Sequence, residues 1–352
     1  MRLYINDLTP KDILSSYNFA RNCDFVYAEN ISTQEYKNFK DSKNRVYFQS
    51  ESMTTYKQTS FTLNENDIIF CNTDFLPNLF SDLKKITKLN NLILLTNQTD
   101  TMITKKIYDK KPKCISRWYS INVDYKNESL VPLPYGLSND YSPKNLKHSD
   151  FRNIHKKDNE KDISMYINFR ITNYKERELL YKEFEKYNWV NIDSPDIKVS
   201  EYVNNLNFNN FVLSPWGNGV DTHRVWETLY SGSIPITKYH ETFSNLEGLP
   251  ILFVNDYKEI TYELLEEFTS SLEEAAFSNE KLTVLYWINK IKENKNEIII
   301  SEDVQENNIL RLRHDVYRKM NMKYRSILKK IIFHLRKVKK IKSYLLDKRL
   351  VK

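Results

Sequence analysis

The chain has 352 residues, of which 40% are hydrophobic and 28% charged, and its formal net charge is +7. This length favours two domains of ordinary size, and the apolar content is sufficient for packed cores, which excludes a disordered chain. No apolar run approaches the roughly 20 residues of a membrane span. Three widely spaced cysteines (Cys23, Cys71 and Cys114) argue against a disulfide framework and a zinc site, and favour a reducing compartment.

Short apolar runs alternate with polar, helix-like stretches over residues 1–147. The expected strands are Arg2–Ile5, Phe25–Tyr27, Asp67–Cys71 and Asn91–Thr96, and helical patterns begin after the last two, at Asp74 and Asp100. A further short strand is expected within Ser129–Asn139, where prolines force extended backbone. Strands that alternate with helices predict a parallel α/β sheet.

A second α/β pattern covers residues 163–310. Its expected strands are Ile163–Phe169, Trp189–Ile192, Asn210–Pro215, Ser233–Lys238 and Ile251–Asp256. Residues 148–162 are polar and charged without periodicity, and we expect them to form a linker between the two halves. Two α/β halves joined in this way predict a cleft at which the carboxyl ends of the strands gather.

The last expected element is a basic amphipathic C-terminal helix, residues 311–352. From Val316 onward, apolar residues recur every three or four positions, and Lys and Arg fill the other faces. Residues 311–352 hold 16 Lys or Arg and two acids, which gives +14 and leaves −7 for the rest of the chain. Such a helix predicts contact with an anionic membrane surface, and nucleic acid is the alternative polyanion.

Glycine is concentrated in one segment. The chain has five glycines, where average usage would give about 25, and four of them (Gly217, Gly219, Gly232 and Gly248) lie within 32 residues. Glycine is needed where φ is positive or where the backbone approaches another group closely. The segment therefore indicates a ligand-binding centre, and the alternative is a tightly packed core with turns.

A phosphate site is expected where this glycine loop meets a helix. Asp221 and Thr222 are favoured residue types for the helix N-cap, and the free amides of the first turn bind anions. Arg224 in the first turn can add a bidentate contact to a phosphate. Glu227, three residues on, shares the same face of the helix, and its carboxylate can accept hydrogen bonds from both hydroxyls of a ribose. The structural alternative is a weak Arg224–Glu227 ion pair on a solvated helix.

The segment FVLSPWGNGVDTHRVWETLYSGSIPI, residues 211–236, resembles the donor-nucleotide motif of exostosin-like glycosyltransferases. It also resembles the corresponding segment of α-1,3-fucosyltransferases, whose Thr-Glu-Lys is replaced here by Thr222-His223-Arg224. Residues 165–177, MYINFRITNYKER, are similar to the first strand and loop of the donor domain in such enzymes. The resemblance implies a GT-B type fold, in which two Rossmann-like domains face each other across a cleft and the C-terminal one binds the donor.

The resemblance implies transfer of a sugar from a nucleotide-sugar co-substrate, with no other cofactor. Arg224 would hold the diphosphate, Glu227 or His223 the ribose, and Arg170 or Arg177 would match a phosphate-contacting arginine. Trp216 can stack on a base or sugar, or be a core aromatic. The expected donor site is Arg170, Arg177, Trp216, Gly217, Gly219, Asp221, Thr222, His223, Arg224 and Glu227. His223 departs from the fucosyltransferase glutamate, so the donor sugar stays open.

No Asp-x-Asp motif stands near an expected strand end, so we expect no metal and a leaving diphosphate neutralised by basic side chains and a helix N-terminus. An inverting transfer needs a general base for the acceptor hydroxyl. Asp100 and Asp74 each follow an expected strand of the first half directly, and Asp100 is preferred. Either could instead be a helix cap, and a retaining mechanism needs no such base.

The sequence thus predicts a glycosyltransferase that acts on a glycan or lipid-linked glycan in bacterial capsule or lipopolysaccharide synthesis. The bacterial origin is expected because eukaryotic relatives of this type carry membrane anchors and none is evident here. We expect the protein in the cytoplasm, peripheral on the inner face of the cell membrane. A sugar epimerase or kinase is disfavoured, since neither GxGxxG nor GxxxxGK[ST] occurs. The alternative is a nucleic-acid-binding protein that uses the basic helix, although we expect no nucleic-acid partner.

Overall fold

The computed structural model describes residues 8–41, 43–141, 145–151, 163–171, 176–272, 276–293, 300–320, 324 and 327. The expected strand Arg2–Ile5 and all of the expected linker beyond residue 151 lie outside this description. The chain forms two compact units, Met1–Val304 and Gln305–Lys352, and each is described by itself below.

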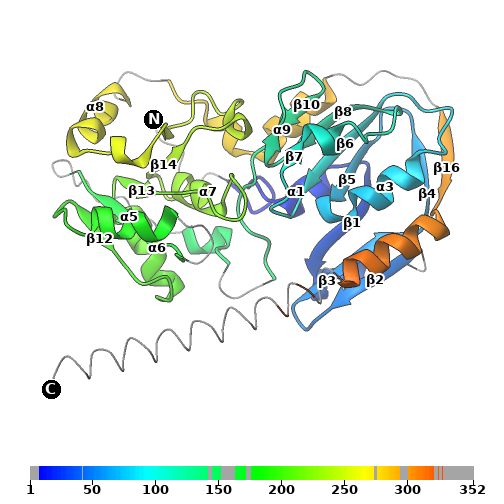
Figure 1. Ribbon diagram of the computed structural model, residues 1–352, viewed down its shortest axis with the longest axis horizontal. Coiled ribbons are helices and arrows are strands. Elements are labelled where there is room, and N and C mark those ends of the chain that lie inside the picture. Colours follow the sequence, from blue (N-terminus) through cyan, green and yellow to red (C-terminus); the bar gives the residue numbers. More distant parts are fainter. Residues whose placement is uncertain are drawn as a thin grey trace. The chain divides into compact units, whose positions relative to one another are not determined.

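The first unit is mixed α/β and contains a seven-stranded sheet, coloured blue to cyan in Figure 1. The strands, in order across the sheet, are β10 (Leu130–Pro132), β8 (Ile115–Ser120), β6 (Leu92–Asn97), β5 (Ile68–Asn72), β1 (Phe25–Ser32), β3 (Met53–Gln58) and β2 (Asn44–Gln49). Every residue of β5 and β6 is buried, as expected for central strands covered on both faces.

The first five strands of this sheet are parallel, whereas β3 and β2 are added antiparallel at the edge. The parallel strands β1, β5 and β6 match the predicted ones. The β2–β3 hairpin and β8 are absent from the sequence-based description, because polar residues such as Arg117 and Gln49 interrupt their apolar patterns. The first sheet, which the sequence predicts to be parallel, is therefore a mixed sheet.

The second sheet of this unit has five parallel strands, green to yellow in Figure 1. Their order is β12 (Val190–Ile192), β11 (Met165–Ile167), β13 (Phe211–Leu213), β14 (Ile234–Lys238) and β15 (Leu252–Val254). The helices that connect or follow them are α5 (Glu176–Phe184), α6 (Val199–Phe208), α7 (His223–Tyr230) and α8 (Tyr262–Leu272). Each strand lies within a predicted one, and α7 is the helix predicted after the glycine loop.

The remaining elements are short. They are α1 (Ser16–Arg21), α2 (Thr33–Phe39), α3 (Leu76–Leu83), α4 (Lys105–Tyr108), α9 (Val284–Lys292), the two-stranded ladders β4 (Ser60–Asn64) with β16 (Ser301–Gln305) and β7 (Ile103–Thr104) with β9 (Val123–Asp124), and the 3-10 turns η2 (Thr73–Phe75), η3 (His148–Phe151), η4 (Glu241–Phe243), η5 (Tyr257–Glu259) and η6 (Asn279–Leu282). The helix expected from Asp100 is only the four-residue α4, because Ile103 and Thr104 pair with β9 instead.

The largest apolar cluster contains side chains of both sheets and their helices. Phe70 and Leu95 from the first sheet belong to it, as do Val212 from the second sheet and Trp226 from α7. Phe151 also belongs to it and is fully buried, so the described part of the expected linker packs against the core. The expected boundaries at 147, 163 and 310 stay a prediction.

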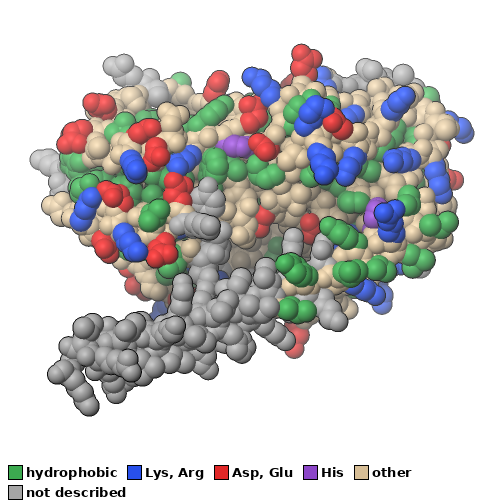
Figure 2. Space-filling model, viewed as in Figure 1, with side chains coloured by type: hydrophobic (Ala, Val, Ile, Leu, Met, Phe, Trp, Pro, Cys, Tyr) green, Lys and Arg blue, Asp and Glu red, His purple; other side chains and the backbone are tan. Residues whose placement is uncertain are grey.

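The second unit contains a helix over residues 308–320, which begins three residues before the predicted start at residue 311. Large apolar side chains on it are exposed; Ile309 is 81% exposed, and Leu312, Val316 and Met320 are each more than half exposed. Figure 2 shows exposed apolar side chains at the place of the orange helix of Figure 1. Among the described residues, no helix combines the length and the apolar character needed to cross a bilayer.

Candidate functional site

The candidate site is built around α7 and the segment that precedes it, residues 214–222, which is called the glycine loop. The apolar strand β13 ends at Leu213, and α7 begins ten residues later, at His223. Val225, Trp226 and Leu229 are buried, which fixes one face of α7 on the core and leaves the face of Arg224 and Glu227 partly open.

Asn122, which follows the first-sheet strand β8, holds the glycine loop. Its Oδ1 accepts hydrogen bonds from the backbone N–H groups of Val220 and Asp221, both at 3.0 Å. A Cβ atom on Gly219 would lie 2.8 Å from Asn122 Nδ2. Gly219 is therefore required by a close approach between segments almost 100 residues apart in sequence.

Asp221 forms a second connection to the same side. Its carboxylate accepts hydrogen bonds from the backbone N–H of Tyr135 at 2.8 Å and from the indole Nε1 of Trp226 at 2.9 Å. Burial raises the pKa of Asp221 to about 7, although these hydrogen bonds oppose the shift. Thr222 occupies the N-cap without a side-chain cap hydrogen bond. Of the two residues expected at the N-cap, Thr222 is therefore the N-cap, whereas Asp221 bonds to the segment after β10.

His223 completes this connection. Its Nδ1 lies 2.7 Å from the carbonyl oxygen of Gly136, and its ring stacks on Tyr135 with centroids 4.0 Å apart. Because the carbonyl accepts, Nδ1 carries the proton, and Nε2 keeps its lone pair. Burial lowers the pKa of His223, opposed by Gly136 and by the charges of Glu227 and Asp100. The imidazole is therefore neutral at pH 7.

Gly136 is the fifth glycine of the chain, outside the glycine-rich segment, yet it lies beside α7. Its φ is +76°, and a Cβ atom there would lie 2.1 Å from the carbonyl oxygen of Leu14. Both conditions exclude other residue types. Gly136 therefore allows the segment after β10 to contact both Leu14 and His223.

Arg224 and Glu227 meet through a third side chain. Arg224 Nη1 donates to the phenol oxygen of Tyr202 at 2.9 Å, and the Tyr202 hydroxyl donates to Glu227 Oε2 at 2.8 Å. The Arg224 guanidinium also lies over the Tyr202 ring, 5.4 Å from its centroid. Burial raises the pKa of Tyr202 well above its usual value, so the phenol stays protonated. Tyr202 of α6 thus orients both predicted donor-site residues.

The two candidate phosphate-binding arginines differ in their surroundings. Arg177 is buried, and its Nε and Nη2 donate to the carbonyls of Trp216 at 2.9 Å and Pro215 at 2.8 Å. Burial and the nearby Arg224 lower its pKa to about 10, so it stays charged. Arg170 is exposed and lies 3.8 Å from Asp196. Arg177 therefore positions the glycine loop.

The carbonyls held by Arg177 border Gly217, where a Cβ atom would lie 3.2 Å from Arg177 Nη2. Trp216 itself is partly buried, and its Nε1 donates to the carbonyl of Lys238 at 3.3 Å. Its ring stands perpendicular to that of His240, with centroids 5.4 Å apart. Trp216 thus packs between the glycine loop and the end of β14.

The two candidate bases lie just beyond neighbouring strands, since β5 and β6 are parallel and paired. Asp100 is exposed; burial raises the pKa of Tyr135 and the charge of Asp100 adds to this, whereas burial lowers the pKa of His223 and the charge of Asp100 opposes this. Asp74 is exposed in η2, where Asn72 Oδ1 accepts its backbone N–H. Of the two candidate bases, Asp100 is the one whose charge acts on Tyr135 and His223.

Sequence reasoning did not find Tyr135 or Gly136, because each lies more than 80 residues from its partner near α7, and it did not find Tyr202, because this residue lies on a different helix, α6. Gly136 carried a detectable signal as an isolated glycine between predicted elements. Within the described residues, no group of three or more His, Cys, Asp or Glu side chains could hold a metal ion. A scan against protein-family models gives no match, and a search of curated proteins gives none.

Proposed function

We propose that this protein is a glycosyltransferase that moves a sugar from a nucleotide-sugar to a hydroxyl of a glycan or lipid-linked glycan. In this proposal the two sheets are the halves of a GT-B type arrangement, with the donor held by the second. Capsule or lipopolysaccharide synthesis is the context that we infer.

One observation carries the proposal: segments of both sheets meet at the start of α7. Asn122 and Tyr135 of the first sheet's loops bond to the glycine loop, while Arg224 and Glu227 remain partly open on the second sheet's helix. Ligand sites of α/β proteins form at the carboxyl ends of parallel strands, where this meeting point lies. The N-terminus of α7 there favours the phosphates of a nucleotide.

The proposed chemistry divides between the two sides. The acceptor oxygen bonds to the anomeric carbon of the donor sugar while the bond from that carbon to the diphosphate oxygen breaks. Arg224 stabilises the negative charge on the leaving nucleoside diphosphate, and Glu227 accepts from the ribose hydroxyls. In an inverting transfer, the acceptor proton moves to Asp100 or to the free Nε2 of His223. A retaining transfer uses neither as a base.

We further propose that residues 308–352 bind the anionic surface of a membrane and bring the enzyme to its acceptor. The exposed apolar residues on the described helix would enter the interface, and the charge of +14 on residues 311–352 would attract anionic lipid.

Nucleotide-sugar hydrolysis is the direct test. Purified protein is incubated with UDP-, GDP-, CMP- and dTDP-sugars, and release of free nucleotide is measured with and without Arg224→Ala. Release from one of these donors, lost in Arg224→Ala, supports the proposal. No release from any donor, with RNA or DNA bound in a strongly salt-dependent manner instead, would favour nucleic-acid binding.

A further inference from the structure

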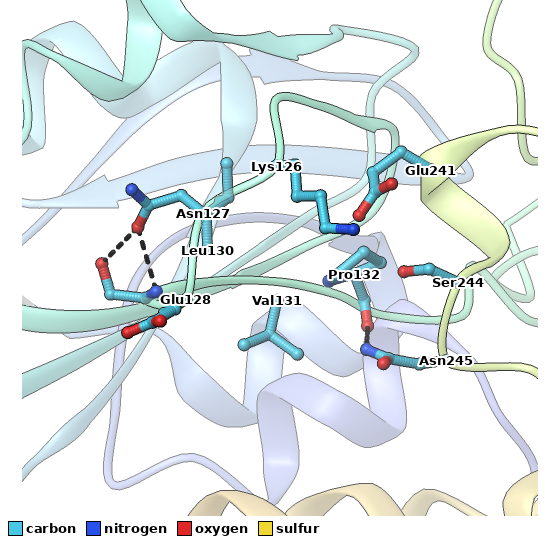
Figure 3. Close-up of a pocket in the computed structure, with 10 residues that line it drawn as sticks. Lys126, Asn127, Glu128, Leu130, Val131, Pro132, Glu241, Ser244 and Asn245 are labelled. Carbon is cyan, nitrogen blue, oxygen red and sulfur yellow. Dashed lines mark hydrogen bonds between the residues drawn. The ribbon is translucent and has the colours of Figure 1, made fainter.

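An open cavity of about 620 Å³ lies between the loop that leads into β10 and the turn η4. This volume is within the range of small-molecule sites. Figure 3 shows its side chains from both walls, with Lys126 and Glu241 directed toward one another. The lining residues are Lys126, Asn127, Glu128, Ser129, Leu130, Val131, Pro132, Glu241, Ser244 and Asn245.

The first wall is attached to the glycine loop at both of its ends. Just before it, Asn122 bonds to Val220 and Asp221, and just after it Tyr135 bonds to Asp221. The wall, residues 126–132, is therefore the segment between two contacts with the same loop. Its position relative to the glycine loop is fixed from both sides.

The second wall consists of Glu241, Ser244 and Asn245. It adjoins the glycine loop through His240, the residue before Glu241. His240 packs against Trp216 of the loop, and its Nε2 lies 3.4 Å from Asp124 Oδ1 of β9. Asn245 Nδ2 donates to the carbonyl of Pro132 at 3.1 Å and so closes one end of the cavity. The cavity is thus lined by one segment that follows β8 and one that follows β14, and residues flanking both segments contact the glycine loop.

The lining suits a neutral ligand that is rich in hydroxyl groups. Two carboxylates and one ammonium give it a formal charge of −1, which disfavours a second phosphate-bearing ligand. Glu241 and Glu128 can each accept hydrogen bonds from two hydroxyls, and Ser244 can donate as well as accept. Leu130, Val131 and Pro132 supply an apolar surface for the C–H face of a sugar ring.

We propose that this cavity binds the sugar residue of the acceptor, a neutral carbohydrate, beside the donor. This inference rests on the proposed glycosyl transfer for its role, but sugar binding to the cavity can be measured without any nucleotide. Glu241 and Ser244 would bind acceptor hydroxyls, and the cavity would determine which acceptors are used.

The test is saturation-transfer NMR of lactose, maltose and N,N′-diacetylchitobiose with the full-length protein. At least one sugar should bind to the wild type, and the double variant Glu241→Gln with Ser244→Ala should weaken its binding at least fivefold. The matched control Glu247→Gln, an exposed glutamate two residues beyond Asn245, should leave the affinity unchanged. Circular dichroism checks that each variant is folded.

Absence of binding by all three sugars, or equal affinity in the double variant, would overturn the inference. Preferred binding of an oligolysine peptide at the cavity would overturn it too, since the acidic lining would then select a cation. Failure of the proposed transfer is seen separately: the wild type would then release no nucleotide from any donor, whatever happens to sugar binding.

Discussion

The glycine loop and the basic helix are both regions that the sequence marks as functional, yet their surroundings differ. Asn122 accepts from the loop, while Tyr135 and Arg177 donate to it, and these hydrogen bonds fix the loop to segments from distant parts of the chain. The helix over residues 308–320 instead exposes Leu312 and Val316. The loop is held by hydrogen bonds within the protein, whereas the helix exposes apolar side chains.

This contrast teaches that position in the fold, not residue type, divides the roles of charged groups. Arg177 and Arg224 both follow strands of the second sheet, but Arg177 is used to hold backbone carbonyls. Arg224 is half-buried, donates to the phenol oxygen of Tyr202 and lies over its ring, and its proposed role is to bind an anion. Changes at the loop should affect chemistry or folding, and changes at the helix should affect binding to a surface.

The largest expected effect is at the candidate base. Asp100→Asn should lower kcat for sugar transfer by about 10²–10⁴-fold, the range for loss of a general base. Asp74→Asn is the matched control, because Asp74 follows the neighbouring strand, and it should keep near-normal activity. If Asp100→Asn is fully active and His223→Gln is not, the proton moves to His223 instead.

The next effect concerns the stability of the loop. The pKa of Asp221 is raised to about 7, so its carboxyl favours the folded state when protonated. That contribution is complete below the usual pKa of an aspartate and is lost as the pH rises through about 7. The free energy of unfolding of the wild type should fall by up to about 1.4 kcal/mol per pH unit between pH 5 and 7, relative to Asp221→Asn.

Chemical denaturation of both proteins at several pH values measures this difference. The variant weakens the hydrogen bonds to Tyr135 and Trp226 at every pH, so the slope is the informative quantity. A stability difference that does not change with pH would show that Asp221 is ionised throughout this range.

A smaller effect is expected in donor binding. Arg224→Ala should weaken binding of a nucleoside diphosphate by about 10–100-fold, since a charged hydrogen bond contributes about 1.5–3 kcal/mol. Tyr202→Phe should weaken it less, because it removes only the group that orients Arg224. Calorimetry measures both, and Arg170→Ala is the exposed control. Equal affinities in all four proteins would remove the donor site from α7.

The smallest effect per residue is expected at the helix. Replacing Ile309, Leu312 and Val316 by Ser should reduce binding to vesicles of phosphatidylglycerol and phosphatidylcholine at least tenfold. The control replaces Val46, Leu179 and Leu285, which are exposed apolar residues of the first unit. Each engaged Lys or Arg contributes about 1 kcal/mol near an anionic surface, so high salt should also weaken binding.

Vesicle sedimentation provides the measurement, and nucleotide binding should be the same in both triple variants. Equal vesicle binding by the two triple variants would show that the apolar stripe does not enter the membrane.

The sequence by itself determined the α/β class, the central strands and the position of α7. Continuous apolar runs identify buried parallel strands such as β5 and β6, and the shift from loop glycines to a 3.6-residue period locates α7. The concentration of glycine also marked the loop correctly as a place of close approach, as Gly219 shows.

Only the tertiary structure decided which groups meet there. Asn122, Tyr135 and Gly136 contact the glycine loop or α7 across more than 80 residues of sequence, and no local pattern encodes such a contact. It likewise placed Arg177 against backbone carbonyls and Tyr202 between Arg224 and Glu227. Local periodicity reports which residues are buried, whereas hydrogen-bond partners depend on how separate segments pack.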